Sequence, residues 1–154
     1  MTRGAGIRRA IIAAAAVLAV DQATKALVRA TIERGDELGI LPGIDLVNTR
    51  NRGVAFGLFA DGGAFLIVFA VLAILGIVVF LAVNAGRPHV WLPMGLLVGG
   101  AAGNLLDRLR DGAVTDFIDL PAWPAFNVAD MAITAGVLGM LWVLEGPRAR
   151  HRPG

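Results

Sequence analysis

The chain has 154 residues, of which 56% are hydrophobic and 17% charged, and its formal net charge at pH 7 is +2. Soluble domains usually carry roughly 45–50% apolar residues, so this composition predicts an integral membrane protein. Cys, Ser and Tyr are absent from the sequence, which excludes a disulfide and a Ser or Cys nucleophile. The two histidines, His89 and His151, lie in a short loop and in the tail, so a His base or a His-ligated metal is not expected.

The first apolar segment runs from about residue 7 to residue 30 and follows three arginines. A basic start before small apolar residues is also the pattern of a cleaved signal peptide. We favour an uncleaved first span, because three more long apolar segments follow and the helical pattern continues through Asp21 and Lys25. Their i, i+4 spacing places these two side chains on one helix face, where an ion pair makes both charges tolerable at the interface.

The next region, residues 31–63, is polar and contains five acids against three arginines. The stretch GIDLVNT alternates weakly, and VAFGLF is apolar with one glycine, so we expect short strands or a flap lying on the membrane surface. The turn at Asn51, Arg52 and Gly53 directs a polar Asn toward whatever these strands face, although Asn is also common in turns for local reasons.

Three further apolar runs complete the chain. Residues 64–83 are uninterrupted and long enough to cross a hydrocarbon core about 30 Å thick. Residues 91–106 are Gly-rich, which permits close helix contact, and residues 128–144 form the last run. The predicted fold class is therefore membrane all-α, with four transmembrane helices and a small extracytoplasmic β/loop cap. We expect a single integral membrane domain over residues 1–154, with the cap formed by residues 31–63 and 107–127.

Arginines predict the orientation of this domain. They lie before the first span, at Arg87 in the loop between the second and third spans, and in the tail after Gly146. These three regions lie on one side of a four-span protein, and positively charged loops favour the cytoplasm. Both termini are thus expected in the cytoplasm, and the polar regions at the outer leaflet.

With this topology, four aspartates reach the outer level of the membrane: Asp21, Asp107, Asp116 and Asp130. Two carboxylates close together in a low-dielectric site cannot both ionise cheaply, so one keeps a proton. Such a pair supplies a general base that activates water and a general acid that protonates a leaving amine. Peptide hydrolysis without a covalent intermediate is the reaction that this arrangement favours.

The spacing leaves open which two aspartates form the pair. Asp107 shares a helix face with Asn104 and Arg108, which favours an ionised, orienting carboxylate. Strand alternation in VTDFIDL places Asp116 on an apolar face, where burial raises its pKa, although a slipped register reverses this.

Asp130 follows Asn127 by three residues, so the two resemble a capping box that opens the last helix. Capping and catalysis are both compatible with this position, because a helix N-terminus also holds a carboxylate rigidly at the membrane surface.

Four separated motifs resemble those of the prolipoprotein signal peptidases, or type II signal peptidases. They are DQATK at residues 21–25, NRGVAF at 51–56, GNLLDR at 103–108 continuing through Gly112, Val114, Asp116 and Phe117, and FNVAD at 126–130. The motifs occur in the family's order and span nearly the whole chain, so the resemblance is specific.

The resemblance implies an aspartic endopeptidase of the bacterial cytoplasmic (inner) membrane. It would remove the signal peptide from a prolipoprotein just before a cysteine that carries a diacylglyceryl group. The family's catalytic pair falls on Asp116 and Asp130. Its supporting polar residues fall on Asp21, Lys25, Asn51, Asn104, Arg108 and Asn127. We expect no metal, cofactor or nucleic acid; the expected partners are the lipid-modified precursor and membrane lipid, and the expected state is a monomer.

Two alternatives come from other classes of protein. A small proton-coupled transporter would use intramembrane aspartates and Lys25 as a proton relay. A non-catalytic assembly factor would dock a partner on its Gly-rich helices. The clustering of ionisable residues at one interface argues against the transporter.

Overall fold

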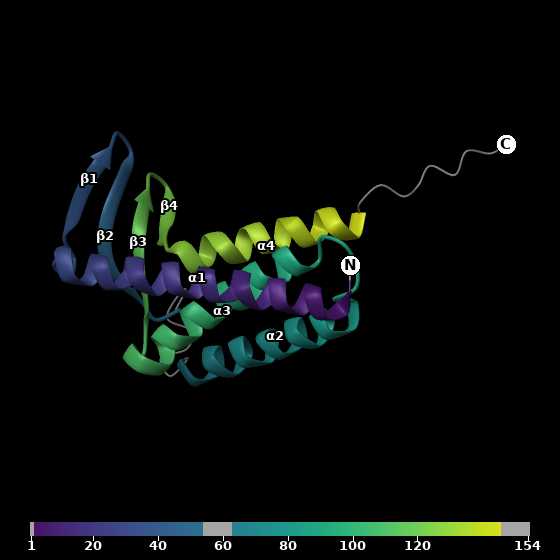
Figure 1. The fold of residues 1–154 in the computed structure, drawn as a ribbon. Helices are drawn as coiled ribbons and strands as arrows, with labels where there is room; N and C mark the ends of the chain where they lie inside the picture. Colours follow the sequence, from purple (N-terminus) through teal and green to yellow (C-terminus); the bar gives the residue numbers. More distant parts are fainter. Residues whose placement is uncertain (1, 54–62, 146–154) are drawn as a thin grey trace.

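The structure is a computed structural model that describes residues 2–53 and 63–145. This part of the chain forms four helices and one antiparallel sheet of four strands (Figure 1). The helices are α1 (Arg3–Thr31), α2 (Gly63–Asn84), α3 (Trp91–Asp111) and α4 (Val128–Glu145), and the strands are β1 (Glu37–Leu41), β2 (Ile44–Asn51), β3 (Val114–Leu120) and β4 (Trp123–Phe126). The predicted class, a helical membrane protein with a small β cap, is confirmed. The apolar VAFGLF stretch lies outside the described residues.

Helix α3 lies at the centre of the bundle and packs against the other three helices. By length and composition α1, α2 and α4 can each cross a membrane, whereas α3 is less uniformly apolar. Its glycines allow the close packing: a Cβ added to Gly99 would lie 2.6 Å from the Ala14 carbonyl oxygen of α1, and one added to Gly100 would lie 2.5 Å from that of Ala129 in α4. The third predicted span is thus the helix that the other three enclose.

Helix α3 also continues past Leu106, where its apolar run ends, to Asp111. It stops at Gly112, whose left-handed φ of 67° suits a residue without a Cβ and whose N–H caps the Arg108 carbonyl. Asp107 and Arg108 therefore project from the last turns of a rigid helix, whereas the predicted cap began at residue 107.

The sheet lies at one end of the bundle, with its strands running across the direction of the helices (Figure 1). Strand β2 pairs with β3 although α2 and α3 come between them in sequence. In this register Asn51 is opposite Val114 and Thr49 is opposite Asp116. The pairing therefore brings the end of β2 beside the buried start of β3.

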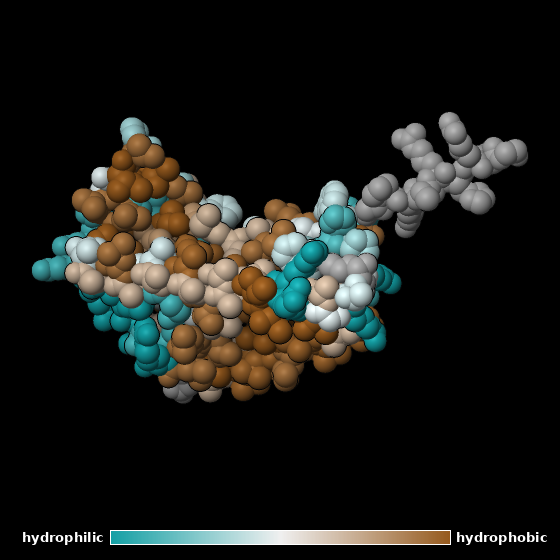
Figure 2. Space-filling model, viewed as in Figure 1, coloured by the Kyte–Doolittle hydropathy of each residue, from teal (hydrophilic) through white to brown (hydrophobic). Residues whose placement is uncertain are grey.

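Phe117 of β3 packs against Val28 and Ile32 at the end of α1, so the sheet is fixed to the bundle by an apolar cluster. The start of α1, the connection between α2 and α3, and the end of α4 lie at the opposite end (Figure 1). Figure 2 shows hydrophobic residues along the side of the bundle and hydrophilic residues gathered toward its two ends. This distribution suits a bundle surrounded by lipid along its length.

Candidate active site

A buried lysine of α1 organises the polar centre of the protein. Lys25 and Asp21 are both fully buried, and Lys25 Nζ lies 2.9 Å from Asp21 Oδ2. The same Nζ lies 2.9 Å from Oδ2 of Asp107, which is also fully buried, and donates to Asn104 Oδ1 at 2.9 Å. The predicted i, i+4 ion pair is present, but it sits inside the bundle and includes a second carboxylate from α3.

The remaining contacts of this cluster join four elements. Asp21 Oδ1 accepts a hydrogen bond from the Ala129 N–H at the start of α4, and Asp107 Oδ2 accepts one from the Thr115 N–H of β3. Gln22 donates to both carboxylates, at 3.1 Å in each case. Because buried charges need partners on every side, these bonds fix the relative positions of α1, α3, β3 and α4.

Two asparagine amides connect this ion cluster to the candidate catalytic pair. Asn104 receives the Lys25 ammonium on its oxygen and donates from Nδ2 to Asp130 Oδ1 at 2.8 Å. Asn127 donates from Nδ2 to Asn104 Oδ1 at 3.2 Å and to Asp116 Oδ1 at 2.6 Å. Neutral amides, with no intervening ammonium or guanidinium, thus link the lysine to both aspartates.

Asn127 and Asp130 form the capping box that their spacing predicts. The Asp130 N–H donates to Asn127 Oδ1 at 3.0 Å, and the Asn127 N–H donates to Asp130 Oδ2 at 3.3 Å. Because the cap holds the oxygen of the Asn127 amide against α4, its nitrogen must face Asp116. The same Asn127 side chain therefore both caps α4 and orients Asp116.

Asp116 is held from both sides by amides. Its Oδ2 accepts from Asn51 Nδ2 at 2.9 Å, opposite the bond from Asn127, and the residue is only 2% exposed. Burial raises the pKa of Asp116, the charge of Asp130 raises it further, and the two amide bonds act in the opposite direction. The predicted rise in pKa through burial is confirmed. The predicted one-sided apolar environment is not found, because all of residues 114–117 are buried and β2 supplies Asn51 beside the carboxyl.

Arg108 completes the site from the last turns of α3. Its Nη1 donates to the Asn104 carbonyl at 3.4 Å, and its charge acts on both Asp116 and Asp130. Its Nε is buried and has no hydrogen-bond partner among the residues that the structure describes. A buried donor of this kind is costly unless another group satisfies it.

Asp130 borders two apolar cavities. One, of about 370 Å³, lies between α2, α3 and α4 and is also bordered by Asn104 and Arg108. The other, of about 510 Å³, lies between the sheet and α4, where Trp123 and Phe126 face Met131, and the surface is hollowed there (Figure 2). A carboxylate at the junction of two apolar cavities suits a substrate with both a scissile polar group and long hydrophobic parts.

The eight predicted site residues form one connected group. Gln22 and Asp107 belong to the same network but are not among the predicted site residues. The spacing that places Asp107 on the same helix face as Asn104 is the feature of the sequence that could have identified it as a site residue. Across residues 2–53 and 63–145, no group of three or more His, Cys, Asp or Glu side chains is arranged to hold a metal ion.

Comparison with known proteins gives consistent results. The family model described as signal peptidase (SPase) II matches residues 13–145. A lipoprotein signal peptidase of Moorella thermoacetica is 40% identical over 139 residues, which cover 89% of this chain and 93% of that protein. One from Oleidesulfovibrio alaskensis is 44% identical over 133 residues, covering 80% and 85% of the two chains.

The fold has a solved counterpart as well. A bacterial membrane enzyme determined by the in meso method at 1.9 Å resolution matches with a TM-score of 0.86 and 30% identity, over 91% of this chain and 94% of the other. The chain therefore belongs to the signal peptidase II family, the intramembrane aspartic proteases that process prolipoproteins.

Proposed function

We propose that Asp116 and Asp130 are the catalytic pair with which this chain cleaves a prolipoprotein just before its diacylglyceryl-modified cysteine. The observation that carries the proposal is that Asn127 bonds both carboxyl groups, one through its amide and one through its backbone N–H. The family membership sets aside the transporter and assembly-factor alternatives, which need no such pair.

The chemistry follows from the unequal environments of the two acids. Burial raises the pKa of Asp116, so we assign it the proton in the resting enzyme, and Asp130 is the base. Asp130 takes a proton from the attacking water while the water oxygen forms a bond to the peptide carbonyl carbon. At the same time Asp116 donates its proton to the carbonyl oxygen. Collapse of the tetrahedral intermediate breaks the C–N bond: Asp130 donates its proton to the leaving amine nitrogen, while Asp116 takes a proton from a hydroxyl of the intermediate as the carboxylic acid product forms. Both acids then have their resting protonation states again.

Arg108 is proposed to position the peptide. Its buried Nε has no partner within residues 2–53 and 63–145, and its side chain borders the cavity between α2, α3 and α4 beside Asp130. A substrate carbonyl in this cavity would satisfy the donor and place the scissile bond near the pair. Asn104 orients Asp130 through its 2.8 Å bond, while Lys25 acts through its bond to Asn104 and, with Asp21, through the helix contacts.

The substrate class is supported by the two apolar cavities that meet at Asp130. A diacylglyceryl precursor has a hydrophobic signal segment and two acyl chains, and it approaches within the bilayer. We propose that it enters laterally and that one chain acts as a monomer, since all eight proposed residues come from one copy.

The orientation proposed is the one with the site at the outer leaflet and both termini in the cytoplasm. Exposed arginines at the start of α1 and at Arg87 occupy one end of the bundle, which the positive-inside bias places in the cytoplasm. The chain has no Cys, so a single introduced cysteine is the one site that a maleimide can label. Glu33→Cys reports the accessibility of the end that carries the sheet, and Gly4→Cys that of the opposite end. A membrane-impermeant maleimide added to intact spheroplasts should label only the Glu33→Cys variant; labelling of Gly4→Cys alone would reverse the orientation.

The catalytic pair is tested with purified protein in detergent and a synthetic diacylglyceryl-cysteine precursor, in the presence of a chelator. Asp116→Asn and Asp130→Asn should each abolish cleavage while the protein stays folded. Asp119→Asn is the matched control: it makes the same change three residues further along β3, where the side chain faces Asp45 across the strands. Appreciable turnover by either of the first two variants would rule out the pair.

A further inference from the structure

The end of the bundle opposite the site carries a concentration of positive charge. Arg3, Arg8 and Arg9 lie in the first turns of α1, and Arg87 lies in the connection between α2 and α3. Among the described residues of the first turns of α1, the connection between α2 and α3, the start of α3 and the last turns of α4, Glu145 is the one acid. Arg3 Nη2 is used in a hydrogen bond to the Val83 carbonyl, which ties α1 to the end of α2.

A small pocket opens at this end, between the first turn of α3 and the last turns of α4. Its volume is about 170 Å³, and its walls are mainly apolar. Gly139 lets α4 approach α3 here, since a Cβ at that position would lie 3.1 Å from Pro93 Cγ. The pocket is therefore formed by packed helices, and the catalytic network does not reach it.

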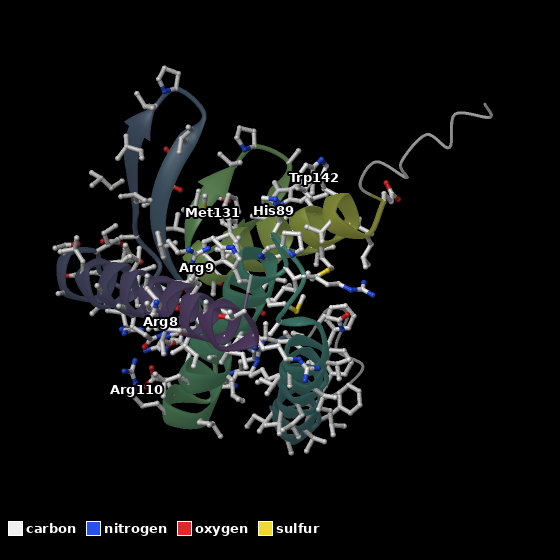
Figure 3. All side chains as sticks on the ribbon, turned by 45° about the vertical axis from the view of Figure 1, so that its right-hand side comes forward. Arg8, Arg9, His89, Arg110, Met131 and Trp142 are labelled. Carbon is white, nitrogen blue, oxygen red and sulfur yellow. The ribbon has the colours of Figure 1, made fainter. Side chains whose placement is uncertain are left out.

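Aromatic side chains line the pocket, and an arginine lies against one of them. Trp91 forms one wall, and the Arg9 guanidinium carbon lies 5.9 Å from the centre of its ring. On the other side the His89 ring meets Trp142 edge-on, with centroids 6.1 Å apart and planes at 76°. Trp142 is 64% exposed, and Figure 3 shows Arg9, His89 and Trp142 on the elements that meet at this end.

We propose that this pocket binds an anionic phospholipid, with the phosphate beside Arg9 and His89 and the start of an acyl chain between Trp91 and Trp142. Tryptophans are enriched at the boundary of the hydrocarbon and headgroup layers, so the pocket lies at the depth of a glycerol backbone. A cation near the membrane surface favours anionic over zwitterionic lipid by about 1 kcal/mol. The apolar walls favour a lipid over free phosphate. The site is separate from the proposed active site and does not depend on it.

Quenching of tryptophan fluorescence by brominated lipids tests the proposal directly. The chain has three tryptophans, and Trp123→Phe leaves the two that line the pocket. The full-length Trp123→Phe protein is measured in phosphatidylcholine vesicles. Its affinity for acyl-brominated phosphatidylglycerol should exceed that for acyl-brominated phosphatidylcholine by about fivefold, the ratio that corresponds to one surface cation. Arg9→Gln should remove most of this selectivity.

Arg8→Gln is the matched control, because it removes the same charge at the neighbouring position, whereas the guanidinium over the Trp91 ring is that of Arg9. It should keep the selectivity, and thermal unfolding should show all variants folded. Equal quenching by the two lipids would overturn the proposal. An equal loss of selectivity in the Arg8→Gln and Arg9→Gln variants would also overturn it, because the selectivity would then depend on overall charge. Competition by soluble glycerol phosphate, or selectivity that appears only when two copies cross-link, would also overturn it. If Arg9→Gln aggregates, Trp142→Leu provides the second variant: the quenching of the remaining Trp91 should then lose its preference for phosphatidylglycerol, and an unchanged preference would overturn the proposal.

Discussion

Replacing Lys25 with Met tests whether the buried ion cluster holds the bundle together. The substitution keeps most of the length of the side chain but removes the ammonium that contacts Asp21, Asp107 and Asn104, each at 2.9 Å. Asp21 and Asp107 are both fully buried, so the variant leaves two carboxylates close together without a cation.

The expected loss of stability is large. Removing one partner of a buried ion pair costs roughly 3–5 kcal/mol, because the remaining charge stays buried and uncompensated. For a protein of this size 1 kcal/mol corresponds to roughly 2–4 °C in the unfolding temperature, so we expect a fall of about 10 °C. Peptidase activity should fall too, since Asn104 loses the ammonium that fixes its amide.

Thermal unfolding in detergent, followed by intrinsic tryptophan fluorescence, measures the effect. Arg110→Met is the control, because Arg110 also pairs with an aspartate at 3.0 Å but is 49% exposed, and such pairs contribute less than about 1 kcal/mol. Adding Asp107→Asn to Lys25→Met should recover part of the stability, since one unpaired charge is removed. A Lys25→Met variant as stable as the Arg110→Met control would refute the role given to the cluster.

Two further predictions concern packing and proton affinity. Gly103→Ala places a Cβ 2.5 Å from Asp21 Oδ2, so it should destabilise the protein by about 1–3 kcal/mol, whereas Gly76→Ala, with nothing within 4 Å, should be neutral or slightly stabilising; equal unfolding temperatures would contradict this. Asn51→Ala removes a hydrogen bond that lowers the pKa of Asp116, so that pKa should rise further and the general acid should stay protonated to higher pH. The basic limb of the pH profile of kcat/KM should therefore move to higher pH in this variant, and a shift to lower pH would exclude Asp116 as the proton holder.

Features that depend on local sequence were predictable. The long apolar runs predict the four helices, and the capping box at Asn127 and Asp130 follows from their spacing. The i, i+4 pair of Asp21 and Lys25 was predictable for the same reason. Each of these depends on residues within one or two helical turns.

Features that depend on pairing between distant segments were not predictable without the resemblance. Asn51 meets Asp116 only because β2 and β3 pair in one register, and residue spacing does not determine that register. The contact of Asp107 with Lys25 requires the close packing of α3 on α1. The end of α3 was predicted too early because the apolar run stops at Leu106, although Gly112 is the usual signal for a helix C-terminus.

The use of amides next to the proposed catalytic pair has a physical reason. A lysine bonded directly to Asp116 would favour its ionised form and lower its pKa, so the acid would lose the proton that catalysis needs. The protein instead pairs Lys25 with Asp21 and Asp107, and lets Asn104 and Asn127 carry the positional constraint to Asp116 and Asp130. Amide donors fix the position of a carboxyl group without bringing a full charge to it. A rigid and buried site of this kind is compatible with the proposal that one proton is kept between the two acids.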